Sequence, residues 1–123
     1  MADKKTIFVA FAIEDERQRD FLKGQSLLTK APFEYIDISV KEAYETNWKD
    51  YVMTRIRRSH GVIALISKNS LGSTGQEWEI ECSKVEGKKL LAIWAYSDDK
   101  TTVPSLNTKS WSWETIRSFI NGL

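Results

Sequence analysis

The chain has 123 residues and a formal net charge of +1, and its charged residues are of both signs. This length fits a single domain, 1–123, with one hydrophobic core. The balanced charge argues against a nucleic-acid or membrane partner. A single cysteine excludes an internal disulfide, and no apolar run approaches the roughly 20 residues of a membrane span. Because no signal peptide begins the chain, we expect a soluble, cytoplasmic protein.

Short apolar runs alternate with helix-like stretches from the start of the chain. The run Ile7–Ala12 predicts a strand buried on both faces. Three acids at 14–16 mark the start of a helix that extends to about Leu28. A second strand is predicted over 33–39. The spacing in the first helix predicts one inward face, made of Phe21, Leu22, Gln25 and Leu28.

The same alternation continues to the end of the chain. A helix is expected at Trp48–Arg58, followed by a strand at Gly61–Ile66 and a helix that ends near Glu86. A fourth strand is expected at Lys89–Ala95 and a brief fifth strand near Trp111. The last helix begins at Trp113, and its inward residues are Trp113, Ile116 and Ile120. Strands that alternate with helices predict an α/β fold. We expect a flavodoxin-like three-layer sandwich with a parallel sheet of 4–5 strands in the order 2-1-3-4-5.

An open parallel sheet binds its ligands beyond the carboxyl ends of the strands, where the strand order reverses. In the expected order this point lies between the first and third strands. The loops after Phe11 and after Ile66 therefore border the same crevice.

Several kinds of site are disfavoured by the residues available. The chain has neither of the two common glycine-rich phosphate loops. His60 is the only histidine and Cys82 the only cysteine, so no metal site is expected. We interpret His60 as structural or superficial and Cys82 as a packed small hydrophobe. Asp37 ends a strand without an acidic pair for Mg²⁺, which disfavours a receiver-like phosphoacceptor.

Carboxylates remain as candidates for chemistry, and Glu79 is the first of them. The loop before it contains two overlapping capping boxes, Ser73 with Gln76 and Thr74 with Glu77. A buried helix face of Trp78, Cys82 and Val85 leaves Glu79 at the helix shoulder, near the crevice, and Glu81 towards solvent. The spacing alone leaves two interpretations open: Glu79 is a catalytic carboxylate, or an ordinary acid of the first helical turns.

The order and spacing of several segments resemble the bacterial TIR-like domains of the Thoeris ThsB type, and through them TIR domains in general. The segments that carry this resemblance are Ile7–Ala12 with the acids after it, Trp48-Lys49, Val62–Ile66, Asn69-Ser70, the sequence Trp78-Glu79-Ile80-Glu81, and Gly87–Ile93. No single segment is specific, but together they cover most of the chain.

The resemblance implies chemistry on NAD. TIR enzymes cleave the bond between nicotinamide and ribose, and ThsB-type members make cyclic ADP-ribose isomers as antiphage signals for an effector protein. It implies an NAD⁺ nucleosidase or cyclic ADP-ribose synthase, with NAD as substrate and no cofactor. The family pattern S-x-W-x-x-x-E falls on Ser73 and Glu79, with Gly75 at the tryptophan position. That departure favours the alternative, a non-catalytic interaction module.

The resemblance also implies further contacts to NAD and to other subunits. Phe11 and Ala12 are expected to line the nicotinamide riboside, and Asn69 and Ser73 are placed to bond the ligand. Tyr44 lies in a loop, 40–47, that corresponds to the BB loop, which in TIR assemblies completes a neighbouring subunit's site. Self-assembly is therefore expected. An alternative interpretation stays open for three of these residues: Phe11 as part of the core, Asn69 as a turn cap and Tyr44 as a plain surface residue.

Overall fold

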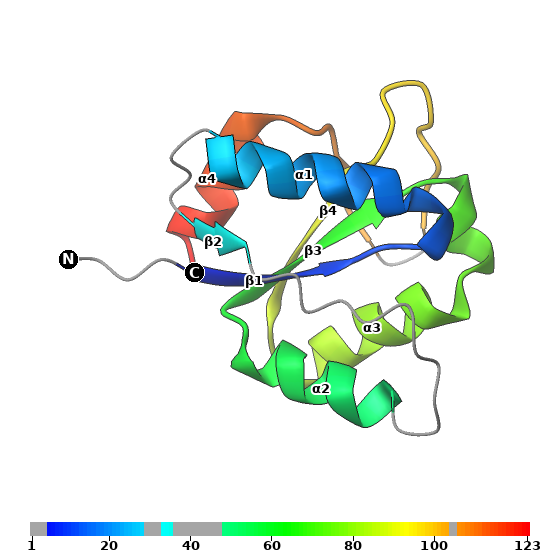
Figure 1. Cartoon of the computed structure of the whole chain (residues 1–123). Coiled ribbons are helices and arrows are strands. Elements are labelled where there is room, and N and C mark those ends of the chain that lie inside the picture. The colour runs from blue at the N-terminus through cyan, green and yellow to red at the C-terminus, as the bar shows by residue number, and fades with distance from the viewer. Residues whose placement is uncertain (1–4, 29–32, 36–47, 104–105) are drawn as a thin grey trace.

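The computed structural model describes residues 5–28, 33–35, 48–103 and 106–123. Over these ranges the chain forms one parallel sheet with helices on both faces (Figure 1). The predicted α/β class is confirmed. Within the same ranges, no helix combines the length and the apolar character that crossing a membrane requires.

The sheet has five strands, and all the neighbours in it pair in parallel. They are β1 (Lys5–Ala10), β2 (Phe33–Tyr35), β3 (Gly61–Ile66), β4 (Lys89–Trp94) and β5 (Thr108–Lys109), hydrogen-bonded in the order β2-β1-β3-β4-β5. All six residues of β3 are buried, as expected of a central strand covered on both faces. The strand order changes direction between β1 and β3, which pair from Ile7 with Gly61 to Ala10 with Ala64.

Helices cover the two faces in pairs (Figure 1). They are α1 (Glu16–Leu28), α2 (Trp48–Arg58), α3 (Thr74–Val85) and α4 (Trp113–Asn121), with short 3-10 helices η1 (Ile13–Asp15) and η2 (Lys68–Gly72). Helices α1 and α4 lie on one face, and α2 and α3 lie on the other. Serine hydroxyls cap α3 and α4: Ser73 accepts from the backbone N–H of Gln76, and Ser112 from that of Thr115, both at 3.1 Å.

The core has two layers because alternate residues of a strand point to opposite faces. Ile7 and Val9 of β1 pack with α1 and α4, whereas Phe8 and Ala10 pack with α2 and α3. Strand β3 divides its residues in the same way. Strands β1, β3 and β4 thus supply apolar side chains to both layers, which fits the continuous apolar runs in the sequence.

Four predicted core positions are wrong or only partly right, and one of them is Trp113 of α4, which is half-buried. Phe21 of α1, predicted inward, is 60% exposed and packs edge-on against Trp111 with ring centroids 6.0 Å apart. Val85, predicted on the buried face of α3, is 76% exposed, and Trp78 is half-buried. The side chains of Gln25 and Leu28 lie outside the described part of the molecule.

The first strand is displaced from its predicted position. Strand β1 covers Lys5–Ala10, two residues earlier in the chain than predicted, so Phe11 and Ala12 follow the strand rather than complete it. Strand β2 is described over Phe33–Tyr35. The rest of the predicted second strand, 36–39 with Asp37, lies outside the described residues.

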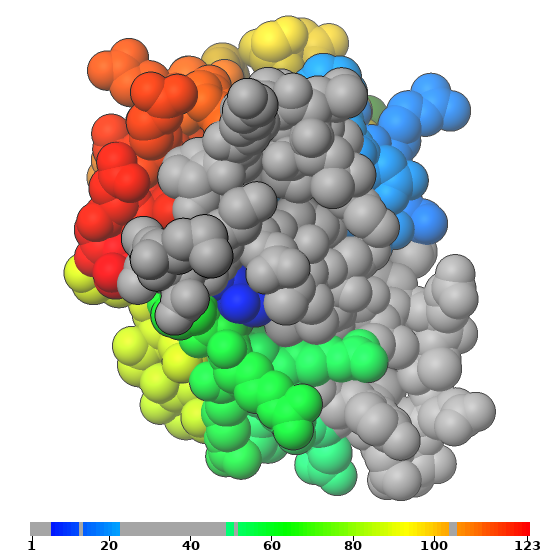
Figure 2. All heavy atoms as spheres, turned by 60° about the vertical axis from the view of Figure 1, so that its left-hand side comes forward, coloured from blue at the N-terminus to red at the C-terminus, as the bar shows by residue number. Residues whose placement is uncertain are grey.

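The amino-terminal edge of the sheet is closed by two contacts. His60 and Thr6 exchange hydrogen bonds: the N–H of Thr6 donates to His60 Nδ1, and the N–H of His60 donates to the Thr6 carbonyl, both at 2.8 Å. Nearby, Lys89 Nζ donates to the Gly122 carbonyl at 2.7 Å. Figure 2 shows α4 in red, α2 in green and a small visible part of β1 in dark blue on this side of the molecule. His60 therefore lies at the edge opposite the carboxyl ends of the strands.

Candidate functional site

The loops that follow β1 and β3 meet at the carboxyl edge of the sheet, around Asp15. This carboxylate is buried and accepts three side-chain hydrogen bonds. Ser67 Oγ donates to Oδ2 at 2.5 Å, while Asn69 Nδ2 and the Tyr96 hydroxyl each donate to Oδ1 at 2.9 Å. Charge-assisted hydrogen bonds of this kind offset the cost of burying an anion. Asp15 therefore joins the ends of β1, β3 and β4 into one polar cluster.

Among the donors of this cluster, Tyr96 has a shifted pKa. Burial raises the pKa of the Tyr96 phenol, and the hydrogen bond and negative charge of Asp15 raise it further. The hydroxyl therefore keeps its proton and remains a donor at neutral pH. A hollow of about 630 Å³ opens beside it, lined also by Asn69 and Lys68.

Gln76, in the first turn of α3, connects this helix to the same edge. Its side chain is buried, and Nε2 donates to the carbonyls of Leu65 at 2.7 Å and Ala10 at 3.1 Å. These carbonyls belong to the last residue of β1 and the penultimate residue of β3. One amide thus bridges the two strands between which the strand order reverses.

The predicted capping box of Ser73 with Gln76 is only half formed for this reason. Ser73 accepts from the Gln76 N–H as expected, but the Gln76 side chain turns to the strand carbonyls instead of back to the cap. Glu77 is exposed. Gln76 thus adds a donor to two buried carbonyls at the ends of β1 and β3.

Glu79 follows Gln76 by three residues and is also completely buried. Helical periodicity puts the two side chains on the same side of α3. The buried residues of this helix are Gly75, Gln76, Glu79, Ile80, Cys82 and Ser83. A carboxylate on the sheet-facing side of a helix is uncommon, because burial of an anion is costly. Glu81, two residues further on, is exposed as predicted.

Cys82 lies one turn after Trp78 and is buried beside these acids. Burial raises the pKa of its thiol, and the negative charges of Glu86 and Glu79 raise it further, although Arg57 opposes them. The thiol stays protonated and packs against α2 and the sheet. This agrees with its interpretation as a small hydrophobe rather than a nucleophile.

The sheet separates two of the predicted site residues, Phe11 and Glu79. Phe11 and Ala12 are buried, and the Phe11 ring belongs to the layer with α1 and α4, where the Arg19 guanidinium lies 4.9 Å from the ring centroid. Glu79 lies on α3, on the other face. The structure therefore does not bring the Phe11 ring and Glu79 together. Tyr44 lies outside the described residues.

Asn69 and Ser73 are both engaged in local structure. Asn69 donates to Asp15 through its side chain, and its N–H donates to Ser67 Oγ at 3.0 Å. Ser73 is the amino-terminal cap of α3. Among the residues that the structure describes, no group of three or more His, Cys, Asp or Glu side chains has the arrangement of a metal site.

Sequence reasoning missed Asp15 and Gln76 as parts of this edge. Asp15 appears in the sequence as one of three acids at a helix start, and Gln76 as a cap. The signal that could have found Gln76 is its spacing of three residues from Glu79, which puts two polar side chains on one side of a helix.

Comparison with known proteins adds one match. The protein family described as "Thoeris protein ThsB, TIR-like domain" matches residues 8–100 of the chain. The matched range runs from β1 to beyond β4 and includes both Asp15 and Glu79. No curated protein matches the chain.

Proposed function

This chain belongs to the family of TIR-like domains of the Thoeris protein ThsB, a family of antiphage defence, and we propose that it cleaves the nicotinamide–ribose bond of NAD. The expected product is a cyclic ADP-ribose isomer that signals to an effector protein. NAD is the substrate, and the reaction needs no cofactor. In this proposal Glu79 is the catalytic carboxylate.

The burial of Glu79 is the observation that carries the proposal. The side chain is on the sheet-facing side of α3, one turn after the amide that bridges Ala10 and Leu65. A protein seldom buries a carboxylate where an apolar side chain would serve the core better. Such a group in a low-dielectric setting interacts strongly with a positive charge that develops nearby.

One carboxylate suffices for this reaction. Nicotinamide leaves NAD⁺ as a neutral molecule, so no general acid is required, in contrast to a glycosidase with its two carboxyl groups. Positive charge develops on the ribose in an oxocarbenium-like transition state. A fixed anion that also accepts hydrogen bonds from the ribose hydroxyls lowers the free energy of that state.

We propose that the ribose enters between the ends of β1 and β3. Ala12, Asn69 and Ser73 are the contacts that we propose for the ligand. Phe11, whose ring is packed beneath Arg19, supports the crevice from the opposite layer. Cyclisation requires that water be kept away while a second nucleophile of the substrate attacks. We propose that self-assembly supplies this exclusion, with Tyr44 of a neighbouring subunit at the site.

The test compares two glutamates of the same helix. Purified protein is incubated with NAD, with and without a crowding agent or a lysate of phage-infected cells, and nicotinamide and ADP-ribose isomers are measured by mass spectrometry. We expect Glu79→Gln to lower the rate by about 10²–10³, as removal of an electrostatic catalytic group does. Glu81→Gln is the matched control, because Glu81 is exposed; it should retain the activity.

Full activity in Glu79→Gln would refute the assignment of the carboxylate. Absence of product from the wild type under every condition would favour the second candidate, a non-catalytic interaction module. Exposed apolar side chains on Leu71 and Val85 of this region favour that candidate. In that case we expect a Leu71→Ser, Val85→Ser double variant to lose self-association in size-exclusion chromatography.

A further inference from the structure

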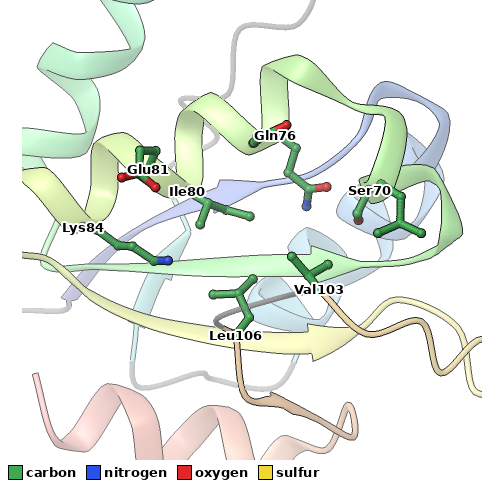
Figure 3. A pocket seen from close by; sticks show the side chains of 9 residues that line it. Ser70, Gln76, Ile80, Glu81, Lys84, Val103 and Leu106 are labelled. Carbon is green, nitrogen blue, oxygen red and sulfur yellow. The ribbon is translucent and has the colours of Figure 1, made fainter.

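A pocket of about 320 Å³ lies beside α3, between this helix and the segment that connects β4 to β5 (Figure 3). The residues that carry the inference line it from both sides: Ser70, Gln76, Ile80, Lys84, Val103 and Leu106. Glu79 is not among the lining residues. The volume is within the range of small-molecule sites.

The amide of Gln76 is the polar feature at the inner end of this pocket. Both of its hydrogen-bond donations go to strand carbonyls, and this fixes the amide plane. The amide oxygen is buried and accepts no hydrogen bond from the described residues. Figure 3 shows the side chain reaching from α3 towards the strands, with the oxygen on the side of Ser70. Since buried acceptors are normally satisfied, this oxygen fits a ligand that brings an N–H donor.

The Ser70 hydroxyl contacts the Leu65 carbonyl, which also accepts a hydrogen bond from Gln76. The hydroxyl lies 3.5 Å from the Leu65 oxygen, and it accepts from the Ser67 N–H at 3.0 Å. Hydrogen bonds to the backbone of 65–67 thus hold the hydroxyl and the Gln76 amide side by side. A donor and an acceptor at one end of a pocket can orient a small polar ligand.

The walls of the pocket are apolar and its charges are mixed. Ile80, Val103 and Leu106 face one another across the space (Figure 3). Glu77, Glu81 and Lys84 also line it, so a ligand with a single charge of either sign meets a like charge. Flat apolar walls with a single inner acceptor suit a neutral aromatic ring that carries an exocyclic N–H.

We propose that this pocket binds a neutral planar heteroaromatic ring with an amide or amino N–H, which donates to Gln76 Oε1 while the ring packs between Ile80 and Val103. Nicotinamide and adenine both have this chemistry. The site is separate from Glu79, and the inference does not depend on NAD cleavage.

The test is a titration of the ¹⁵N-labelled full chain with nicotinamide, adenine or nicotinic acid, followed by two-dimensional NMR. We expect saturable shifts of the Gln76, Ile80 and Leu106 amides with nicotinamide or adenine, with a Kd on the order of 1 mM or below for a ligand of this size. Nicotinic acid, whose carboxylate has no donor, should bind at least tenfold more weakly than nicotinamide. Which of the two rings binds more tightly identifies the source of the ligand.

Two variants separate the pocket from non-specific binding. Val103→Trp fills the space and should weaken binding at least tenfold, whereas Thr102→Trp, at an exposed neighbour outside the pocket, should bind as the wild type does. Glu79→Gln should also bind normally, even where it abolishes activity, so failure of this inference is distinct from failure of the proposed function. Absence of saturable binding by both rings, or equal binding by Val103→Trp, would overturn it.

Discussion

Asp15 carries a buried negative charge that is held by three donors from distant parts of the chain. Its partners Ser67, Asn69 and Tyr96 follow β3 and β4. Each of these donors is positioned by its bond to the carboxylate, so the cluster works as a unit. Removing the acceptor leaves the donors without their partner in a partly buried setting, which costs more than a single hydrogen bond contributes.

We therefore expect Asp15→Ala to lower the free energy of unfolding by about 3 kcal/mol, the scale expected when several partly buried donors lose their acceptor. Urea denaturation followed by tryptophan fluorescence measures it. Asp98→Ala, at an exposed aspartate of the same edge, should change the stability by less than about 0.5 kcal/mol. Equal stabilities of the two variants would contradict a structural role for the Asp15 cluster.

The role of Asp15 could not be predicted from the sequence. Its donors lie 52 to 81 residues further along the chain, and nothing in the local pattern around 14–16 distinguishes the middle acid from its neighbours. By contrast, the apolar strand at Gly61–Ile66 and the helix at Trp48–Arg58 were predicted with their observed bounds. Their signals are local periodicity and composition, whereas the cluster depends on tertiary contacts.

At the scale of an element, α3 shows why the apolar pattern misidentified the buried face. Trp78, Cys82 and Val85 are its apolar residues at helical spacing, but Val85 is exposed, and the buried residues include Gln76 and Glu79. The helix turns polar side chains towards the sheet, where Gln76 satisfies strand carbonyls. Trp78 lies half-buried, with Lys49 Nζ 5.8 Å from its ring centroid. The spacing of apolar residues identifies the buried face of a helix only where no buried backbone group needs a side-chain hydrogen-bond partner.

The segments after β3 and β4 are joined by Asp99, and this contact depends on pH. The Thr101 hydroxyl donates to Asp99 and lowers the pKa of its carboxyl, and the Lys68 N–H, at 2.9 Å, lowers it further. A carboxyl with a lowered folded-state pKa stabilises the fold above its ordinary pKa of 3.8. That contribution is lost as the pH falls through the lowered value.

The stability difference between wild type and Asp99→Asn should therefore be constant from about pH 7 to pH 5 and shrink between about pH 4 and pH 3. Urea midpoints across this range measure it. Asp98→Asn is the matched control at the exposed neighbour. A difference that does not change down to pH 3 would mean that the ionised Asp99 carboxylate contributes nothing.

At the scale of the whole molecule, the end of the chain packs against the start of the central strand. A Cβ atom on Gly61 would lie 2.8 Å from Leu123 Cδ2 and 3.2 Å from Phe119 Cζ. Glycine at this position leaves room for side chains of and beyond α4. Lys89 holds the neighbouring Gly122 carbonyl, so the contact has a polar and an apolar part.

A double-mutant cycle should detect this packing. We expect Gly61→Ala to lower the free energy of unfolding by about 1 kcal/mol, the usual cost of mild overpacking. In a Leu123→Ala background the same change should cost nothing or stabilise, because alanine is favoured over glycine within a strand. Gly72→Ala, where a Cβ meets no atom within 4 Å, is the control. Additive effects of Gly61→Ala and Leu123→Ala in urea denaturation would exclude the contact.

The packing of Leu123 against Gly61 has a practical consequence for experiments in which the protein is immobilised on a surface. Gly61 begins β3, so its contact with Leu123 lies at the amino-terminal edge of the sheet. Asp15, Gln76 and the ends of β1 and β3 lie at the carboxyl edge. A tether or fluorescent reporter attached after Leu123 would leave the crevice facing the bulk solution. The attached group would instead disturb the packing of Leu123 against Gly61. We therefore expect the attachment to lower the thermal stability before it affects ligand access.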